Sequence, residues 1–157
     1  MGHRYTGYSS RRTAVVAESV LNIALIPETA KLKMPDDKFE IPVGAKSVTA
    51  INSSPNKDSR FTFVYAPGAG SNINDPFGEY LRSRLPAAGA SLVRFQFPYM
   101  EAGRRGPDRT PVLEETWRQA LSTFPGERTK LIVGGRSMGG RIASQVVAQG
   151  PPVDGLV

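Results

Sequence analysis

A serine flanked by glycines two positions before and two positions after it places the strongest constraint on this chain. Residues 135–139 read Gly-Arg-Ser-Met-Gly and follow an apolar run at 131–133. The segment after them has apolar residues at helical spacing. A serine between a strand and a helix must occupy a tight turn, where flanking side chains would collide with the neighbouring backbone. Gly135 and Gly139 therefore predict a sharp bend at Ser137.

From residue 38 onward, short apolar runs alternate with segments of helical period. Strands are expected at residues 39–43, 47–52, 61–65, 91–95 and 131–133, with a further strand opening at 153–157. This alternation is typical of strands joined by crossover helices. The expected fold class is therefore α/β, a three-layer sandwich with a mostly parallel central sheet, cut short after the helix that follows Ser137.

Two helices are expected to start at a proline. Asp75 can cap a helix that begins at Pro76, and Thr110 can cap one that begins at Pro111. The apolar faces of the two helices are expected to contain Phe77, Leu81 and Leu85 in the first and Leu113, Trp117, Leu121 and Phe124 in the second. Residues 97–108, rich in glycine, proline and arginine, are expected to form a long loop.

Composition excludes several kinds of site. The 157 residues contain no cysteine, which excludes disulfides and cysteine-ligated metals. His3 is the only histidine and lies near a terminus, so the chain offers no evident histidine base or histidine metal site, and no cofactor is expected. The net charge of +6 is scattered and accompanies no nucleic-acid motif, so we expect no nucleic-acid partner.

The first 37 residues are expected to be an N-terminal extension, and residues 38–157 an incomplete domain. The apolar stretch at 14–26 follows two arginines, as in a signal peptide, but Glu18 and Asn22 interrupt it. A short amphipathic helix is the preferred interpretation, and an organellar presequence is the alternative. No apolar run approaches the ~20 residues that cross a bilayer. We therefore expect no membrane association and a cytoplasmic location.

The bend at Ser137 fits the nucleophile-elbow pattern, in which a strained turn lifts a serine hydroxyl above the carboxyl edge of a sheet. Ser137 is therefore the expected catalytic nucleophile. An oxyanion hole of this type takes one N–H from the residue after the nucleophile, here Met138. The second comes from the loop after an earlier strand, where residues 66–70 read Ala-Pro-Gly-Ala-Gly. Ala69 is the candidate for that second N–H, because the glycines around it allow close backbone approach.

Three segments in combination point to a family. Residues 66–70 are the first, residues 94–105 read Arg-Phe-Gln-Phe-Pro-Tyr-Met-Glu-Ala-Gly-Arg-Arg, and residues 134–141 contain the elbow. Together they resemble the dienelactone-hydrolase-like branch of the α/β-hydrolase superfamily, which includes the testis-expressed and chromatin-complex hydrolase-like proteins. The resemblance covers about residues 38–157. It implies an α/β-hydrolase fold and hydrolysis of a small-molecule ester, thioester or lactone through an acyl-enzyme. Pro67 departs from the family, because such proteins often carry histidine there.

The family's order of catalytic residues is serine, then acid, then histidine. After Ser137 the sequence holds one acid, Asp154, at the start of an expected strand, and no histidine. Without a base, a serine hydroxyl is a weak nucleophile. The chain is therefore expected to be an inactive fragment that lacks its downstream acid and histidine. The alternative is a non-catalytic interaction module of the same fold that binds a protein partner.

Other features carry lesser expectations. Tyr99, Arg104 and Arg105 are candidate contacts to an acidic substrate, and the alternative is solvated arginines with Tyr99 packed on the rim. The Gly-Ala-Gly after the third strand could suggest dinucleotide binding, but Ile73 replaces the third glycine of that motif. An apolar last strand would leave a sheet edge unpaired, which predicts self-association through that edge.

Overall fold

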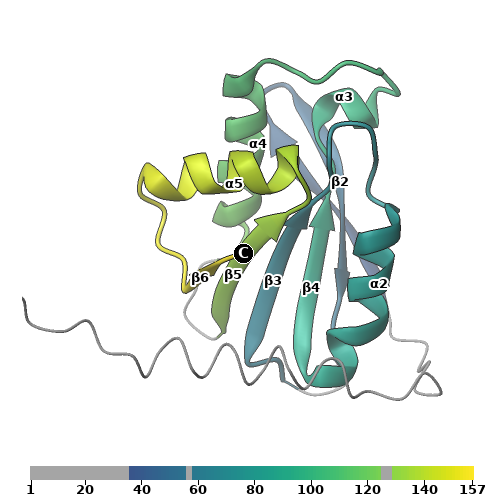
Figure 1. Ribbon diagram of the computed structural model, residues 1–157, viewed down its shortest axis with the longest axis vertical. Helices are drawn as coiled ribbons and strands as arrows, with labels where there is room; N and C mark the ends of the chain where they lie inside the picture. The colour runs from purple at the N-terminus through teal and green to yellow at the C-terminus, as the bar shows by residue number, and fades with distance from the viewer. Residues whose placement is uncertain (1–35, 56–57, 125–128) are drawn as a thin grey trace, which may run out of the picture.

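The computed structural model describes residues 36–55, 58–124 and 129–157, so the helix expected within residues 14–26 lies outside the described residues. A six-stranded sheet with the strand order β1-β2-β4-β3-β5-β6 forms the centre of the molecule (Figure 1). Its strands are β1 (Asp36–Val43), β2 (Lys46–Ser53), β3 (Phe61–Ala66), β4 (Ala90–Phe95), β5 (Lys130–Gly135) and β6 (Gly155–Leu156). The expected strands are thus confirmed, with ends that differ by a few residues.

The direction of the strands changes part-way across the sheet. β1 pairs with β2 and β2 with β4 in antiparallel fashion, whereas β4–β3, β3–β5 and β5–β6 are parallel pairs. In the β3–β5 ladder, Tyr65 is opposite Gly134 and Ala66 is opposite Gly135. The loops that leave β3 and β5 therefore start side by side at the same edge of the sheet.

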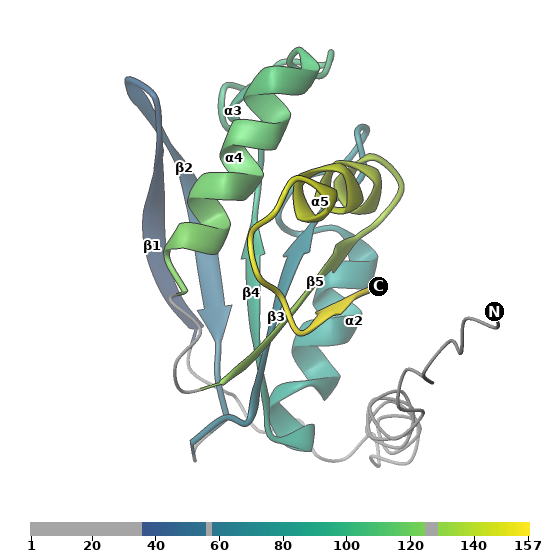
Figure 2. The same cartoon turned by 90° about the vertical axis from the view of Figure 1, so that its left-hand side faces the viewer.

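Helices cover both faces of the sheet, which gives the three expected layers. They are α2 (Pro76–Arg84), the short 3-10 helix η1 (Pro86–Ala88), α3 (Pro98–Glu101), α4 (Thr110–Ser122) and α5 (Met138–Ala148). Helices α4 and α5 lie on one side and α2 on the other (Figure 2). Within residues 36–55, 58–124 and 129–157, no helix is both long enough and apolar enough to cross a membrane.

The two layers of core follow from the alternation of side chains along the strands. Val64 and Ala66 of β3 belong to the larger cluster, which also contains Trp117 of α4 and Ile142 of α5. Tyr65, between them, belongs to a smaller cluster under α2. A continuous apolar run such as β3 is thus explained by burial on both faces, as in other parallel sheets.

Two helix starts illustrate what short-range patterns decide. Asp75 caps α2 as predicted, since its carboxylate accepts the backbone N–H groups of Phe77 at 3.0 Å and Gly78 at 3.1 Å. The prediction for α4 was wrong by one residue, because Arg109 is the N-cap and makes no side-chain capping bond, while Thr110 is the first helical residue. The extended backbone of Arg109 sets the start of α4 without a capping side chain.

Two further expectations were incomplete. The prediction that Phe77 lies on the buried face of α2 was wrong, because its side chain is 47% exposed. The expected loop at 97–108 contains helix α3, which starts at Pro98 because proline favours the first position of a helix.

Candidate active site

Ser137 occupies the sharp bend that the sequence predicts. Its φ of 51° and ψ of −111° lie outside the helical and extended regions, and it is the only non-glycine with positive φ among the residues that the structure describes. Such a conformation costs of order 1–3 kcal/mol and persists only where the surroundings impose it. Ser137 is exposed at the surface and directly precedes Met138, the first residue of α5.

The glycines around Ser137 are required by the close approach of β3. A Cβ placed on Gly135 would lie 2.5 Å from the carbonyl oxygen of Ala66, and one on Gly139 would overlap the same oxygen. Gly140 is equally constrained, since a Cβ there would lie 2.5 Å from the carbonyl oxygen of Gly135. The sequence predicted the need for Gly135 and Gly139. It did not predict the need for Gly140, because the nucleophile-elbow motif ends at Gly139.

The loop after β3 runs directly beside the elbow. A Cβ placed on Gly68 would lie 3.7 Å from Cβ of Ser137, so residues 67–70 border the serine on one side. Met138 follows Ser137 directly, and its N–H is one of the first four N–H groups of α5, which have no partner within the helix. The structure therefore places the 67–70 loop, which contains Ala69, and the start of α5, which begins at Met138, next to Ser137. The roles of Ala69 and Met138 as oxyanion donors stay predictions.

Tyr99 reaches the same loop from a different element. Its side chain is 1% exposed, and its hydroxyl donates a hydrogen bond to the carbonyl oxygen of Ala69 at 2.7 Å. Burial, with a smaller contribution from the charge of Asp108, raises the pKa of the Tyr99 phenol, which keeps it a neutral donor. The hydroxyl is thus buried and already paired, which agrees with the interpretation of Tyr99 as a packed side chain, and a substrate contact at Tyr99 stays a prediction.

Residues 59–157, more than half of the chain, match the family model described as an alpha/beta hydrolase domain. This chain belongs to the α/β hydrolase family. The resemblance drawn from its three segments is thus confirmed at the level of the family.

Solved structures show the same fold. A dienelactone hydrolase from Anabaena variabilis matches with 19% identity and a TM-score of 0.62 over 75% of this chain and 59% of its own. An alpha-beta serine hydrolase homologue from Coxiella burnetii matches with 19% identity and a TM-score of 0.63 over 74% and 59%. A cold-adapted esterase from an Arctic intertidal metagenomic library matches with 19% identity and a TM-score of 0.61, over 76% of this chain and 58% of its own. This α/β hydrolase chain spans about three-fifths of the length of these neighbours.

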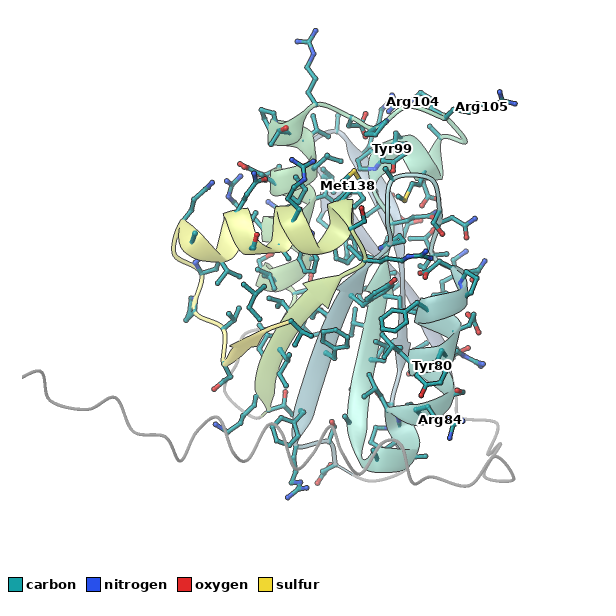
Figure 3. The ribbon with its side chains drawn as sticks, viewed as in Figure 1. Tyr80, Arg84, Tyr99, Arg104, Arg105 and Met138 are labelled. Atoms are coloured by element: carbon teal, nitrogen blue, oxygen red, sulfur yellow. The ribbon has the colours of Figure 1, made fainter. Side chains whose placement is uncertain are left out.

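The arginines of the 97–108 segment lie on the outside of this α/β hydrolase. Arg104 forms an ion pair with Asp108 at 2.5 Å while its side chain stays 53% exposed. Arg105 is also exposed, and both side chains lie at the end of the molecule beyond α3 (Figure 3). Their positions agree with the solvated interpretation, and a contact to an acidic substrate stays a prediction.

A shallow groove beside the elbow was not foreseen. It has a volume of about 590 Å³ and is lined by Pro76, Phe77, Tyr80, Gly135 and Arg136. The rings of Phe77 and Tyr80 stack at 6.4 Å between centroids, and each side chain is nearly half exposed. The sequence offered a signal in these two aromatics, but the helical spacing of Phe77 favoured a core position.

Asp154 binds to the first residues of β5 in the sheet of this α/β hydrolase. Its carboxylate accepts the backbone N–H of Leu131 at 2.9 Å and lies 3.6 Å from the ammonium group of Lys130. These contacts join the segment before β6 to the start of β5, at the end of β5 opposite Ser137. Asp154 therefore has a structural role, as its place at a strand start suggested. Among residues 36–55, 58–124 and 129–157, no three potential metal ligands come together.

Proposed function

We propose that Ser137 is the nucleophile of a serine hydrolase that acts on an ester, thioester or lactone. The observation that carries this proposal is the strained conformation of Ser137 at the N-terminus of α5, with the 67–70 loop beside it. Strained backbone is retained where function uses it, and here it presents a hydroxyl at the positive end of a helix.

The chemistry follows from these positions. The Oγ of Ser137 attacks the carbonyl carbon of the substrate while a base takes the hydroxyl proton. The carbonyl oxygen becomes an oxyanion between the N–H groups of Met138 and Ala69. Collapse of this intermediate breaks the bond from the acyl carbon to oxygen or sulfur, and the protonated base returns its proton to the leaving alcohol or thiol, which in a lactone stays attached to the acyl chain. The same base then takes a proton from water, which attacks the acyl group on Ser137 and releases the acid.

The base limits what the chain can do alone. His3 is its only histidine and precedes the domain, and the one acid after Ser137, Asp154, is bonded to the backbone of β5. Triads that lose the base keep only about 10³–10⁴ of the rate enhancement over water, supplied by the oxyanion hole and binding. We therefore expect the 157-residue chain to react slowly at Ser137 and to turn over poorly.

Labelling with a fluorophosphonate probe tests the proposal. Intact-mass measurement should detect one phosphonyl adduct on the wild-type chain after long incubation, and none on Ser137→Ala. A longer chain that continues past Val157 should react faster if it supplies an acid and a histidine. An adduct that persists in Ser137→Ala, or no adduct in either chain, would refute the enzyme and favour the non-catalytic module that binds a protein partner.

Other properties stay predictions. We expect a cytoplasmic location, no nucleic-acid or membrane partner, and residues 1–37 acting as an extension of the domain. Self-association is also expected, because Leu156 at the edge strand is 46% exposed and apolar edges template further pairing. Light scattering at increasing protein concentration would detect it, and a monodisperse monomer would contradict it.

A further inference from the structure

A row of four aromatic side chains connects the two sides of the elbow. Trp117 contacts Phe95 edge-on with 4.8 Å between ring centroids, Phe95 contacts Phe97 at 5.7 Å, and Phe97 stacks on Tyr99 at 6.4 Å. All four are buried, with at most 1% exposure. Dense packing of this kind transmits a displacement of one side chain to its neighbours.

Each end of the row carries a hydrogen-bond donor, and each donor bonds to a backbone carbonyl oxygen in one of the two segments next to Ser137. The indole N–H of Trp117 donates to the carbonyl oxygen of Gly139 in the first turn of α5. The hydroxyl of Tyr99 donates to the carbonyl oxygen of Ala69. Figure 3 shows Tyr99 and Met138 at the same end of the sheet, beyond the ends of β3 and β5.

The contact at Ala69 fixes the direction of a backbone group. A trans peptide is planar, so its C=O and N–H point in opposite directions. The carbonyl oxygen of Gly68 accepts the N–H of Ser71 at 3.1 Å, which orients the peptide that contains the N–H of Ala69. The hydroxyl of Tyr99 orients the next peptide, between Ala69 and Gly70. These two hydrogen bonds restrain the peptide planes on either side of Ala69, and with them the direction of its N–H.

Tyr99 is itself held on both sides. Its N–H donates to a carboxylate oxygen of Asp108 at 2.8 Å, and its carbonyl oxygen accepts the N–H of Arg104 at 2.8 Å. Asp108 also pairs with the guanidinium group of Arg104. The exposed 102–109 segment is thereby connected to the loop beside Ser137 through one buried side chain.

We propose that Tyr99 is a positioning residue that holds the N–H of Ala69 toward the developing oxyanion, without touching the substrate itself. This inference rests on the proposed function, because it assigns Ala69 a role in stabilising charge. It predicts that the Tyr99 hydroxyl affects the reaction of Ser137 more than it affects stability.

Tyr99→Phe tests this, since it removes one oxygen and leaves the ring in the row. Tyr65→Phe is the matched control: Tyr65 is also 1% exposed, and its hydroxyl donates to a carboxylate oxygen of Asp75, the N-cap of α2, at 3.0 Å. A bond to a charged acceptor is the stronger of the two, so the control should lose at least as much stability. Both variants and the wild-type chain are labelled with the fluorophosphonate over a range of probe concentrations.

For Tyr99→Phe we expect the maximal labelling rate to fall about tenfold, part of the 10²–10³ lost when an oxyanion donor is removed. The probe concentration at half-maximal rate should not change. Amide hydrogen exchange at Ser71 should also become faster, because the loop is released. Tyr65→Phe should label at close to the wild-type rate and should not accelerate exchange at Ser71.

Equal rate losses in the two variants would overturn the proposal, since they would trace to stability alone. So would a normal rate in Tyr99→Phe when Ser137→Ala abolishes labelling. If wild-type Ser137 takes no label, the proposed function fails, and exchange at Ser71 decides the positioning contact separately. Faster exchange in Tyr99→Phe but not in Tyr65→Phe supports the contact, and unchanged exchange overturns it.

Discussion

The indole N–H of Trp117 donates a hydrogen bond to the carbonyl oxygen of Gly139 at 3.1 Å, and this contact ties α4 to the first turn of the elbow helix. Trp117 is fully buried, so water cannot replace the bond if it is lost. The position of α5, and with it the N–H of Met138, therefore depends on a side chain that lies 20 residues earlier in the sequence than Ser137.

Trp117→Phe should destabilise the domain by about 2–4 kcal/mol, because it leaves a buried carbonyl without a partner and opens a cavity. Urea unfolding followed by far-UV circular dichroism measures this, since Trp117 is the only tryptophan and fluorescence would be lost. If Trp117→Phe lowered the free energy of unfolding by less than about 1 kcal/mol, the hydrogen bond to Gly139 would stabilise the domain no more than a solvent-exposed hydrogen bond does.

Gly139→Ala should destabilise by about 3 kcal/mol or more, because its methyl group would overlap the backbone of Ala66, which cannot move without disturbing β3. Gly106→Ala is the control, since no atom lies within 4 Å of a Cβ placed there. Thermal unfolding of the two variants should therefore differ strongly. Similar melting temperatures would mean that the elbow does not pack against β3 as described.

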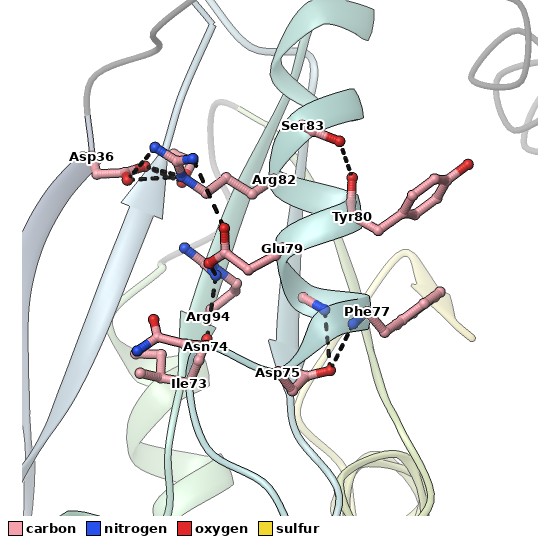
Figure 4. Close-up of polar contacts among 12 residues, drawn as sticks. Asp36, Ile73, Asn74, Asp75, Phe77, Glu79, Tyr80, Arg82, Ser83 and Arg94 are labelled. Carbon is pink, nitrogen blue, oxygen red and sulfur yellow. Dashed lines mark hydrogen bonds and ion pairs between the residues drawn. The ribbon is translucent and has the colours of Figure 1, made fainter. Parts of the chain in front are cut away.

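Glu79→Ala should cost about 2 kcal/mol, because it leaves the guanidinium group of Arg94, 1% exposed under α2, without its carboxylate partner (Figure 4). This expected loss is smaller than the 3–5 kcal/mol for breaking a fully buried ion pair, because Glu79 is 43% exposed. Glu115→Ala, which removes a pairing with Arg118 at 3.7 Å on the surface, should cost less than about 1 kcal/mol. Equal losses in urea unfolding would contradict this order.

Asp36 should make stability depend on pH in acid. Partial burial raises the pKa of its carboxyl group, but the hydrogen bonds from Arg82 and Ser53 and the charge of Arg82 outweigh this, so the pKa lies below its ordinary value of 3.8. A lowered pKa stabilises the fold above the ordinary value, and this contribution disappears as pH falls through the folded value.

Asp36→Asn should therefore cost about 1 kcal/mol near neutral pH and nothing once Asp36 is protonated in the wild-type chain. Unfolding free energies measured over a pH series give the comparison. A constant difference at all pH values would show that the loss comes from packing and not from the pair with Arg82, whose closest N–O distance is 2.6 Å.

Local sequence determined the elements of this fold and the bend that presents Ser137. Apolar runs, the Asp75 cap before Pro76 and the glycines at 135 and 139 act over a few residues, so their consequences can be deduced without knowing the rest of the molecule. Gly140 escaped notice because the atom it must avoid belongs to the same turn, yet the motif does not specify that position.

Tertiary structure decided the partners of those elements. Tyr99 meets Ala69 across 30 residues, and nothing near Tyr99 in the sequence indicates that its hydroxyl is buried and not on the rim. Phe77 has helical spacing for the core, but whether a helical face is covered depends on what packs against it, and here it borders a groove. Steric effects within a few residues follow directly from the types of those residues. Contacts between distant segments depend on the order of the strands in the sheet, which brings those segments together.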